Sequence, residues 1–316
     1  MKDTSGTPCF SCGNLIVFLS ILMPALAFDL PASIASDWKE TTWQGEKAWE
    51  STSSGWTAVV SAERSRLVAI TDAATGENLL FATPTKDAVS WGGHRCWLGP
   101  QSGWKANWPP PVDWEASAAD QVVASGTLLT VTHPRTDGAF PVLLRTYQWR
   151  EGVLHCDLRW QGGRHHAIHI LQLPPWSLVH VRRAVTKDLP LGYAWPQTSK
   201  PFETLTDVVL PAGISRVDGD AVTLWHANLS AKVAFTPQEI SAEIGKYQLK
   251  MRRGTVSGVT ENSPDFGLLT QVYLGDWQNP FVEIEQLSPY ADGAGAAMEI
   301  LVEPIRPKHH PASAKQ

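Results

Sequence analysis

Short stretches in which apolar and polar residues alternate recur along most of this chain, separated by clusters of glycine, proline, asparagine and aspartate. In residues 153–160 every second side chain is apolar: Leu154, Cys156, Leu158 and Trp160. Because successive side chains of a strand point to opposite faces, this pattern is typical of a strand with one buried face. Windows with apolar residues at helical spacing are scarce, so the pattern predicts an all-β protein with one short helical turn at 236–244.

The same pattern locates the other expected strands, and their short connections favour antiparallel pairing in a sandwich or a pair of larger sheets. We expect strands at 56–62, 66–72, 126–133, 140–149, 153–160, 167–173, 206–210, 221–225, 231–235, 247–252, 268–274, 281–287 and 298–302. No change of composition divides residues 28–303, which are expected to form a single domain. Residues 304–316 are polar and rich in proline, and we expect a disordered tail there.

The first 27 residues have the features of a secretory signal peptide. Lys2 precedes an apolar run at 15–23, and small residues at 25–27 predict cleavage after Ala27. No later stretch approaches 18 apolar residues, so we expect an exported protein, periplasmic or extracellular, without membrane insertion. A Cys-x-x-Cys motif at 9–12 would be removed with this leader. Cys96 and Cys156 would remain, and the sequence leaves open whether they pair.

Several classes of function are disfavoured by the sequence. The net charge of −5 and the lack of basic runs argue against a nucleic-acid partner. The chain has no Gly-x-Ser-x-Gly elbow and no phosphate-binding loop, and the glycines at 293–295 depart from the dinucleotide-binding pattern. The histidines of 164–169 lack the spacing of a metal motif. We therefore expect neither a cofactor nor a metal.

Residues 91–114 combine tryptophans, a His-Arg pair and a triple proline. Flat indoles beside a guanidinium suit a ligand with apolar faces and hydroxyl rims, which describes a sugar ring. We interpret this stretch as one wall of a binding cleft, and its candidate substrate-binding residues are Arg95, Trp97, Trp104, Trp108 and Asp113. The alternative is that the tryptophans fill the core of a large β protein.

Residues 281–287 place two carboxylates on one face of an expected strand. Glu283 and Glu285 would lie about 6.6 Å apart along the strand, beside Phe281 and Leu287. Two neighbouring carboxylates raise the pKa of one of them, and a carboxyl group with a raised pKa can exchange protons with a sugar hydroxyl. His94 is the first candidate for the partner acid, with His169 and His180 behind it. A solvated strand face is the alternative.

Several motifs together resemble the galactose mutarotase-like superfamily, in particular a branch of exported bacterial proteins. They are Gly-Gly-His-Arg-x-Trp at 92–97, Pro-Gln at 100–101, the prolines at 109–111, Pro-Trp at 175–176 and Val-Glu-Ile-Glu-Gln-Leu-Ser-Pro at 282–289. The resemblance implies an antiparallel β-supersandwich with a sugar-binding cleft on the concave face of one sheet. The residues expected to bind substrate also include Trp176, which belongs to one of these motifs, together with His169 and His180.

Aldose 1-epimerases of this superfamily use a late glutamate as general base and a histidine as general acid to open and close the sugar ring. The resemblance implies Glu285 or Glu283 as the base and Arg95 as the residue that grips the substrate. The Asn-His pair that contains the family's general acid is absent from this sequence, so the resemblance does not indicate which residue would be the acid. Our hypothesis is a carbohydrate-binding protein with 1-epimerase chemistry; the alternative is a non-catalytic glycan-binding module. A lyase or hydrolase fits less well, because two acids on one strand do not flank a scissile bond.

Overall fold

The computed structural model describes residues 35–83, 92–104, 109–134, 140–182, 193–194, 213–227, 230–260, 262–293 and 295–307. The expected leader at 1–27, the expected strand at 206–210 and residues 308–316 of the expected tail lie outside these ranges. No helix in the described part of the chain is long and apolar enough to cross a membrane. All described residues belong to one compact unit, which begins at residue 33.

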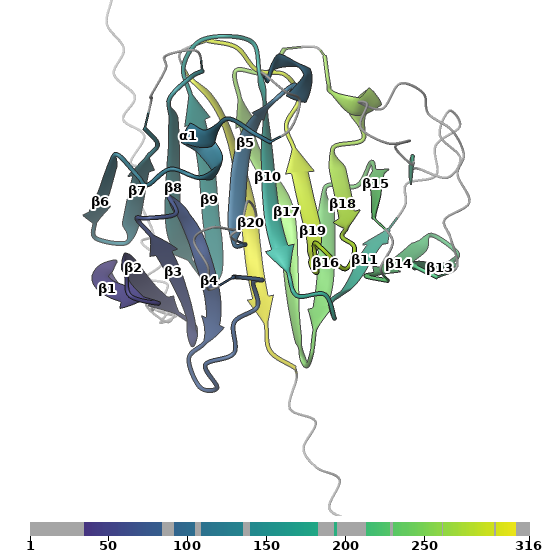
Figure 1. Cartoon of the computed structure of the whole chain (residues 1–316), viewed down its shortest axis with the longest axis horizontal. Coiled ribbons are helices and arrows are strands. Elements are labelled where there is room, and N and C mark those ends of the chain that lie inside the picture. Colours follow the sequence, from purple (N-terminus) through teal and green to yellow (C-terminus); the bar gives the residue numbers. More distant parts are fainter. Residues whose placement is uncertain are drawn as a thin grey trace, which may run out of the picture. The chain divides into compact units, whose positions relative to one another are not determined.

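The described strands form three antiparallel sheets (Figure 1). The four-stranded sheet contains, in order, β1 (Lys39–Trp43), β2 (Glu46–Ser53), β3 (Trp56–Ser61) and β4 (Arg66–Asp72). The six-stranded sheet has the order β12 (Tyr193–Ala194), β15 (Ala231–Phe235), β18 (Thr270–Leu274), β19 (Val282–Leu287), β10 (His166–Leu173) and β5 (His94–Gly99).

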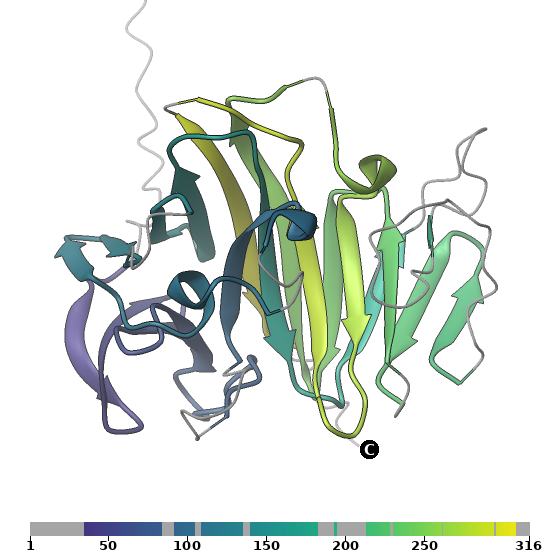
Figure 2. The same cartoon turned by 45° about the horizontal axis from the view of Figure 1, so that its top comes forward.

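The ten-stranded sheet forms the other large layer (Figures 1 and 2). Its order is β13 (Ser215–Asp218), β14 (Ala221–Trp225), β11 (Leu178–Arg182), β16 (Glu239–Ile244), β17 (Tyr247–Ser257), β20 (Ala296–Ile305), β9 (Val153–Trp160), β8 (Leu143–Arg150), β7 (Leu128–Thr132) and β6 (Gln121–Ser125). One short helix, α1 (Val112–Glu115), and single 3-10 turns at Gln101–Gly103 and Asp265–Gly267 complete the described elements.

The hydrophobic core lies between the six-stranded and ten-stranded sheets. In β9 the even-numbered residues are buried and the others are more exposed, as the alternation predicted. Strands β5, β10 and β19 differ, because all their residues are buried on both faces. One face contributes Leu171, Val282 and Ile284 to the core. The other face therefore buries a different set of side chains, and it carries the candidate site.

The structure confirms the antiparallel all-β prediction and corrects several details. The expected helical turn at 236–244 is wrong: Glu239–Ile244 is a strand in which Ile240, Ala242 and Ile244 alternate with more exposed residues. The other strands that were not predicted are β1, β2, β5, β6, β11, β12 and β13. β20 continues to Ile305, so residues 304 and 305 belong to the sheet and not to a disordered tail.

Candidate functional site

A row of polar side chains crosses the central strands of the six-stranded sheet. Residues that pair directly across neighbouring strands point to the same face. Arg95 pairs with Ile170, and Glu285 pairs with Ile170 from the other side. The register continues this face through β10, β19, β18 and β15. We call it the polar face, and its polar members are Arg95, Gln172, Lys232, Gln271, Tyr273, Glu283 and Glu285.

Arg95 is the centre of a buried charge network at one side of the polar face. Its guanidinium contacts Glu283 at 2.8 Å and Glu115 of α1 at 2.9 Å, and it stacks 4.4 Å from the ring centre of Trp97. The indole Nε1 of Trp97 donates to the second oxygen of Glu115 at 2.9 Å. Burial raises the pKa of Glu115, but Arg66 and Arg95 outweigh it and hold that pKa below its usual value.

The two glutamates of β19 have different partners. The amide nitrogen of Gln172 donates to Oε1 of Glu283 at 2.8 Å, beside the bond from Arg95. Burial raises the pKa of Glu283, although Arg95 opposes the shift. Oε2 of Glu285 accepts from Nζ of Lys232 at 2.9 Å, while its Oε1 is buried and meets no hydrogen-bond partner in the described part of the chain. Each glutamate thus has one cation of its own on the polar face.

His94 and His169 point away from this face. They belong to β5 and β10, and side chains alternate along both strands, so each lies on the sheet face opposite to Arg95 and the glutamates. The ring of His94 contacts the hydroxyl of Tyr147 on β8, in the interior between the two large sheets. The expectation that His94 supplies the acid for Glu283 or Glu285 is therefore corrected: the structure does not bring these groups together.

The remaining predicted residues are dispersed. Trp97 lies at the polar face, and Trp104 is buried beside it with ring centres 5.7 Å apart. Asp113 is buried in α1. Trp176 is 68% exposed in the turn after β10. His180 belongs to the ten-stranded sheet, where it contacts Glu243 at 3.2 Å, and Trp108 lies outside the described residues.

Five residues of the site were not predicted from the sequence: Glu115, Gln172, Lys232, Gln271 and Tyr273. Glu115 directly follows the tryptophan-rich stretch. Gln172 lies two residues after Ile170 in a strand that was predicted correctly, so the two side chains share a face. Both signals were available, but nothing in the order of residues connects Lys232 with Glu285. Cys96 and Cys156, whose pairing the sequence left open, are both free thiols in the interior.

A separate hollow of about 1030 Å³ lies on the ten-stranded sheet. Its walls are the side chains of β7, β8, β9, β17 and β20 that point away from the core, including His155, Asp157, Arg159 and Glu299. Nδ1 of His155 lies 2.7 Å from Glu299 within it. None of the described residues predicted to form a site lines this hollow, so it is distinct from the polar face.

Comparison with known proteins identifies the fold. No protein-family model matches the chain, and no curated protein sequence matches it. Among solved structures, a candidate aldose 1-epimerase from Escherichia coli K12 is similar to it with a TM-score of 0.51, at 14% identity over 80% of this chain and 96% of that one. The candidate mutarotase YeaD from Salmonella typhimurium is similar with a TM-score of 0.55, at 8% identity over 85% and 94%.

The three antiparallel sheets define a β-sandwich protein. Its arrangement is the galactose mutarotase-like fold, which the motifs at 92–97 and 282–289 predicted. At this level of identity the likeness concerns the fold, and function has to be argued from the site.

Proposed function

We propose that this protein binds a carbohydrate on the polar face of its six-stranded sheet. The observation that carries the proposal is Oε1 of Glu285, a buried carboxylate oxygen that has no hydrogen-bond partner among the described residues, although Oε2 of the same side chain accepts from Lys232. Leaving such an oxygen unpaired costs free energy, and a ligand hydroxyl that donates to it removes the cost. A sugar offers such hydroxyl donors.

The neighbouring side chains fit the same class of ligand. Arg95, Gln172 and Lys232 supply fixed donors for ring and hydroxyl oxygens, while the two glutamates supply acceptors. Lys232 keeps 28% of its side chain exposed, so solvent reaches the polar face at β15, next to the buried Glu285. Solved structures of this fold that are described as a candidate aldose 1-epimerase and a candidate mutarotase add support.

Interconversion of sugar anomers is a second candidate function, favoured by the different environments of the two glutamates. Glu285 would accept the proton of the anomeric hydroxyl while the bond from the anomeric carbon to the ring oxygen breaks. Glu283, whose pKa burial raises, would enter the reaction protonated and donate its own proton to that oxygen. Rotation and reversal of both transfers then close the ring as the other anomer. No cofactor enters this scheme.

The binding proposal is tested by titrating the protein with a panel of aldoses, using NMR or calorimetry. The variant Glu285→Gln removes the carboxylate, and Glu299→Gln on the ten-stranded sheet is the matched control. We expect at least one aldose to bind, Glu285→Gln to weaken it about tenfold or more, and Glu299→Gln to bind as the wild type does. Circular dichroism checks that each variant is folded.

Polarimetry of freshly dissolved anomers separates the two candidate functions. Faster equilibration by the wild type than by buffer, lost in Glu285→Gln, supports 1-epimerase chemistry. Equilibration at the buffer rate together with aldose binding leaves a glycan-binding module. Failure of every aldose to bind a folded wild-type protein rejects both.

A further inference from the structure

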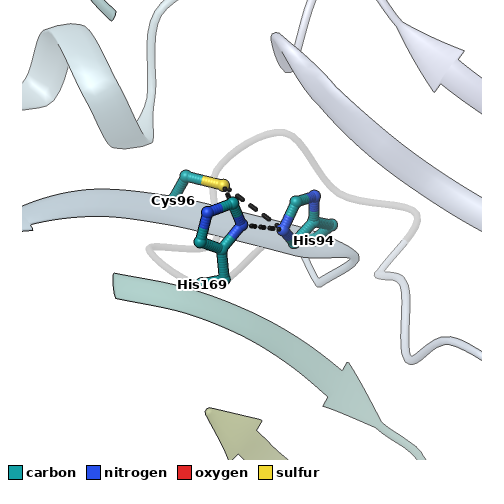
Figure 3. Close-up of side chains that lie close together, drawn as sticks. All are labelled: His94, Cys96 and His169. Carbon is teal, nitrogen blue, oxygen red and sulfur yellow. Dashed lines mark hydrogen bonds between the residues drawn. The ribbon is translucent and has the colours of Figure 1, made fainter. Parts of the chain in front are cut away.

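Three side chains that the polar face does not use converge on the opposite face of the same sheet. His94 and Cys96 are two residues apart on β5 and therefore share a face, and His169 of β10 pairs directly with Cys96. Figure 3 shows both imidazole rings and the thiol pointing toward one another. Their nearest nitrogen and sulfur atoms all lie within 4.8 Å, and the three residues are buried. Two imidazoles and a thiol form a ligand set for a transition metal.

The distances between these atoms suit a shared ion. Nε2 of His94 lies 3.0 Å from Nδ1 of His169, and Sγ of Cys96 lies 3.3 Å and 3.5 Å from these two nitrogens. Metal bonds of about 2.0 Å to nitrogen and 2.3 Å to sulfur place ligand atoms about 3.3–3.7 Å apart. The three side chains therefore need to separate by only a few tenths of an ångström to accept an ion between them.

The outer nitrogens of both rings are held by the surrounding strands. Nε2 of His169 lies 3.2 Å from the backbone carbonyl of Met298, which only accepts, so this nitrogen carries the proton and Nδ1 presents a lone pair toward the cluster. Nδ1 of His94 lies 3.4 Å from the hydroxyl of Tyr147, a group that can accept as well as donate. Such partners orient the ligating histidines in metal sites.

The surrounding charge selects among ions. The guanidinium of Arg145 donates to the backbone carbonyl of Cys96 at 3.0 Å and reaches that of His94 at 3.4 Å, so a fixed positive charge already lies beside the cluster. A monovalent ion bound to the Cys96 thiolate gives a neutral complex, whereas a divalent ion leaves a further buried positive charge next to Arg145. We propose that His94, Cys96 and His169 bind Cu(I), a soft monovalent ion that prefers thiolate and imidazole ligands.

Burial determines how the ion would be held. Because the three ligands are sealed between the sheets, Cu(I) enters as the sandwich forms and leaves only when the sheets separate. Binding converts the Cys96 thiol to a thiolate and releases its proton to solvent. The site is independent of carbohydrate binding, since its ligands and the polar face lie on opposite faces of the sheet.

The full chain is refolded without oxygen in the presence of one equivalent of Cu(I) and then separated from weakly bound metal with the Cu(I) chelator bicinchoninate. Copper is quantified by mass spectrometry, and its ligands are determined by X-ray absorption. We expect about one copper per chain, bound by two imidazole nitrogens and one sulfur. Cys96→Ser should retain about a tenth of the wild-type copper or less. Cys156→Ser, which removes the other buried thiol, should retain as much copper as the wild type.

If Cys96→Ser fails to fold, the X-ray absorption spectrum of copper bound to the wild-type protein still tests the proposal, because it identifies the ligands directly. Absence of retained copper, a spectrum without sulfur, or equal loss in both cysteine variants would overturn the proposal. Preferential retention of Zn²⁺ from an equimolar mixture with Cu(I) would also overturn it, because the charge argument requires a monovalent ion.

Discussion

Arg95 and Glu283 are bonded across an intervening strand: Nη1 of Arg95 donates to Oε1 of Glu283 at 2.8 Å, although 188 residues separate them. Their strands, β5 and β19, both flank β10. Two long polar side chains therefore reach across β10, where Arg95 pairs with Ile170 and Glu283 pairs with Gln172, to meet on the polar face. This bond joins the tryptophan-rich stretch to the acidic strand, the two segments that the sequence suggested would form one site.

Removing the guanidinium of Arg95 should destabilise the fold strongly. Arg95→Met leaves the buried carboxylates of Glu115 and Glu283 without their shared cation, and loss of one partner of a buried ion pair costs about 3–5 kcal/mol. The matched control is Arg159→Met, because the guanidinium of Arg159 is exposed and its pair with Asp157 should contribute less than about 1 kcal/mol. Urea unfolding measures both, and equal losses would contradict the buried network.

Gly93 should tolerate no side chain. Its φ is +77°, and a Cβ there would lie 2.2 Å from the backbone oxygen of Leu67. Gly76 has a similar φ of +75° with nothing within 4 Å, so Gly76→Ala isolates the cost of the backbone conformation, about 1–2 kcal/mol. We expect Gly93→Ala to lower the free energy of unfolding by clearly more than Gly76→Ala. Similar values for the two variants would show that β4 and β5 do not approach as closely as described.

His166 should make the protein less stable in acid. Burial lowers its pKa from 6.5 to about 3, so between these values the unfolded chain binds a proton that the folded chain does not. The free energy of unfolding therefore falls as pH drops from 6.5 toward 3. His166→Phe keeps a ring beside Tyr290 and should flatten this decline by about 1.4 kcal/mol per pH unit. Denaturation curves at pH 7, 5 and 4 measure the slope, and an unchanged slope would refute the assignment.

Asp72 and Arg306 should stabilise the protein at neutral pH and lose that effect in acid. Arg306 donates to both oxygens of Asp72 at 2.8 Å and 3.0 Å and lowers its pKa below the usual value. The contribution is present above the unfolded pKa of about 3.9 and disappears as pH falls through the lower folded pKa. Asp72→Asn should lower the unfolding midpoint at pH 7, with a smaller gap from the wild type at pH 3. Arg306→Met should lower the unfolding midpoint in the same way. A difference from the wild type that is larger at pH 3 than at pH 7 would contradict the lowered pKa of Asp72.

Local sequence was sufficient for the fold class and for part of the site. The alternation along 153–160 predicted a strand, because a strand with one buried face shows a period of two residues in its sequence. The strand at 167–173 was also predicted, although β10 is buried on both faces. The shared face of Glu283 and Glu285 follows from the same geometry. β5 was missed because it is buried on both faces and shows no alternation. Without that strand, the opposite directions of His94 and Arg95 could not be inferred.

The sequence by itself determined an antiparallel β-sandwich and two chemistry-bearing segments. Only the tertiary structure decided their partners: Lys232 with Glu285, Glu115 with Arg95, and His169 with His94 and Cys96. The physical reason is register. Which residues meet across β5, β10 and β19 depends on how distant strands slide into pairing, and a shift of one residue would turn every side chain to the other face.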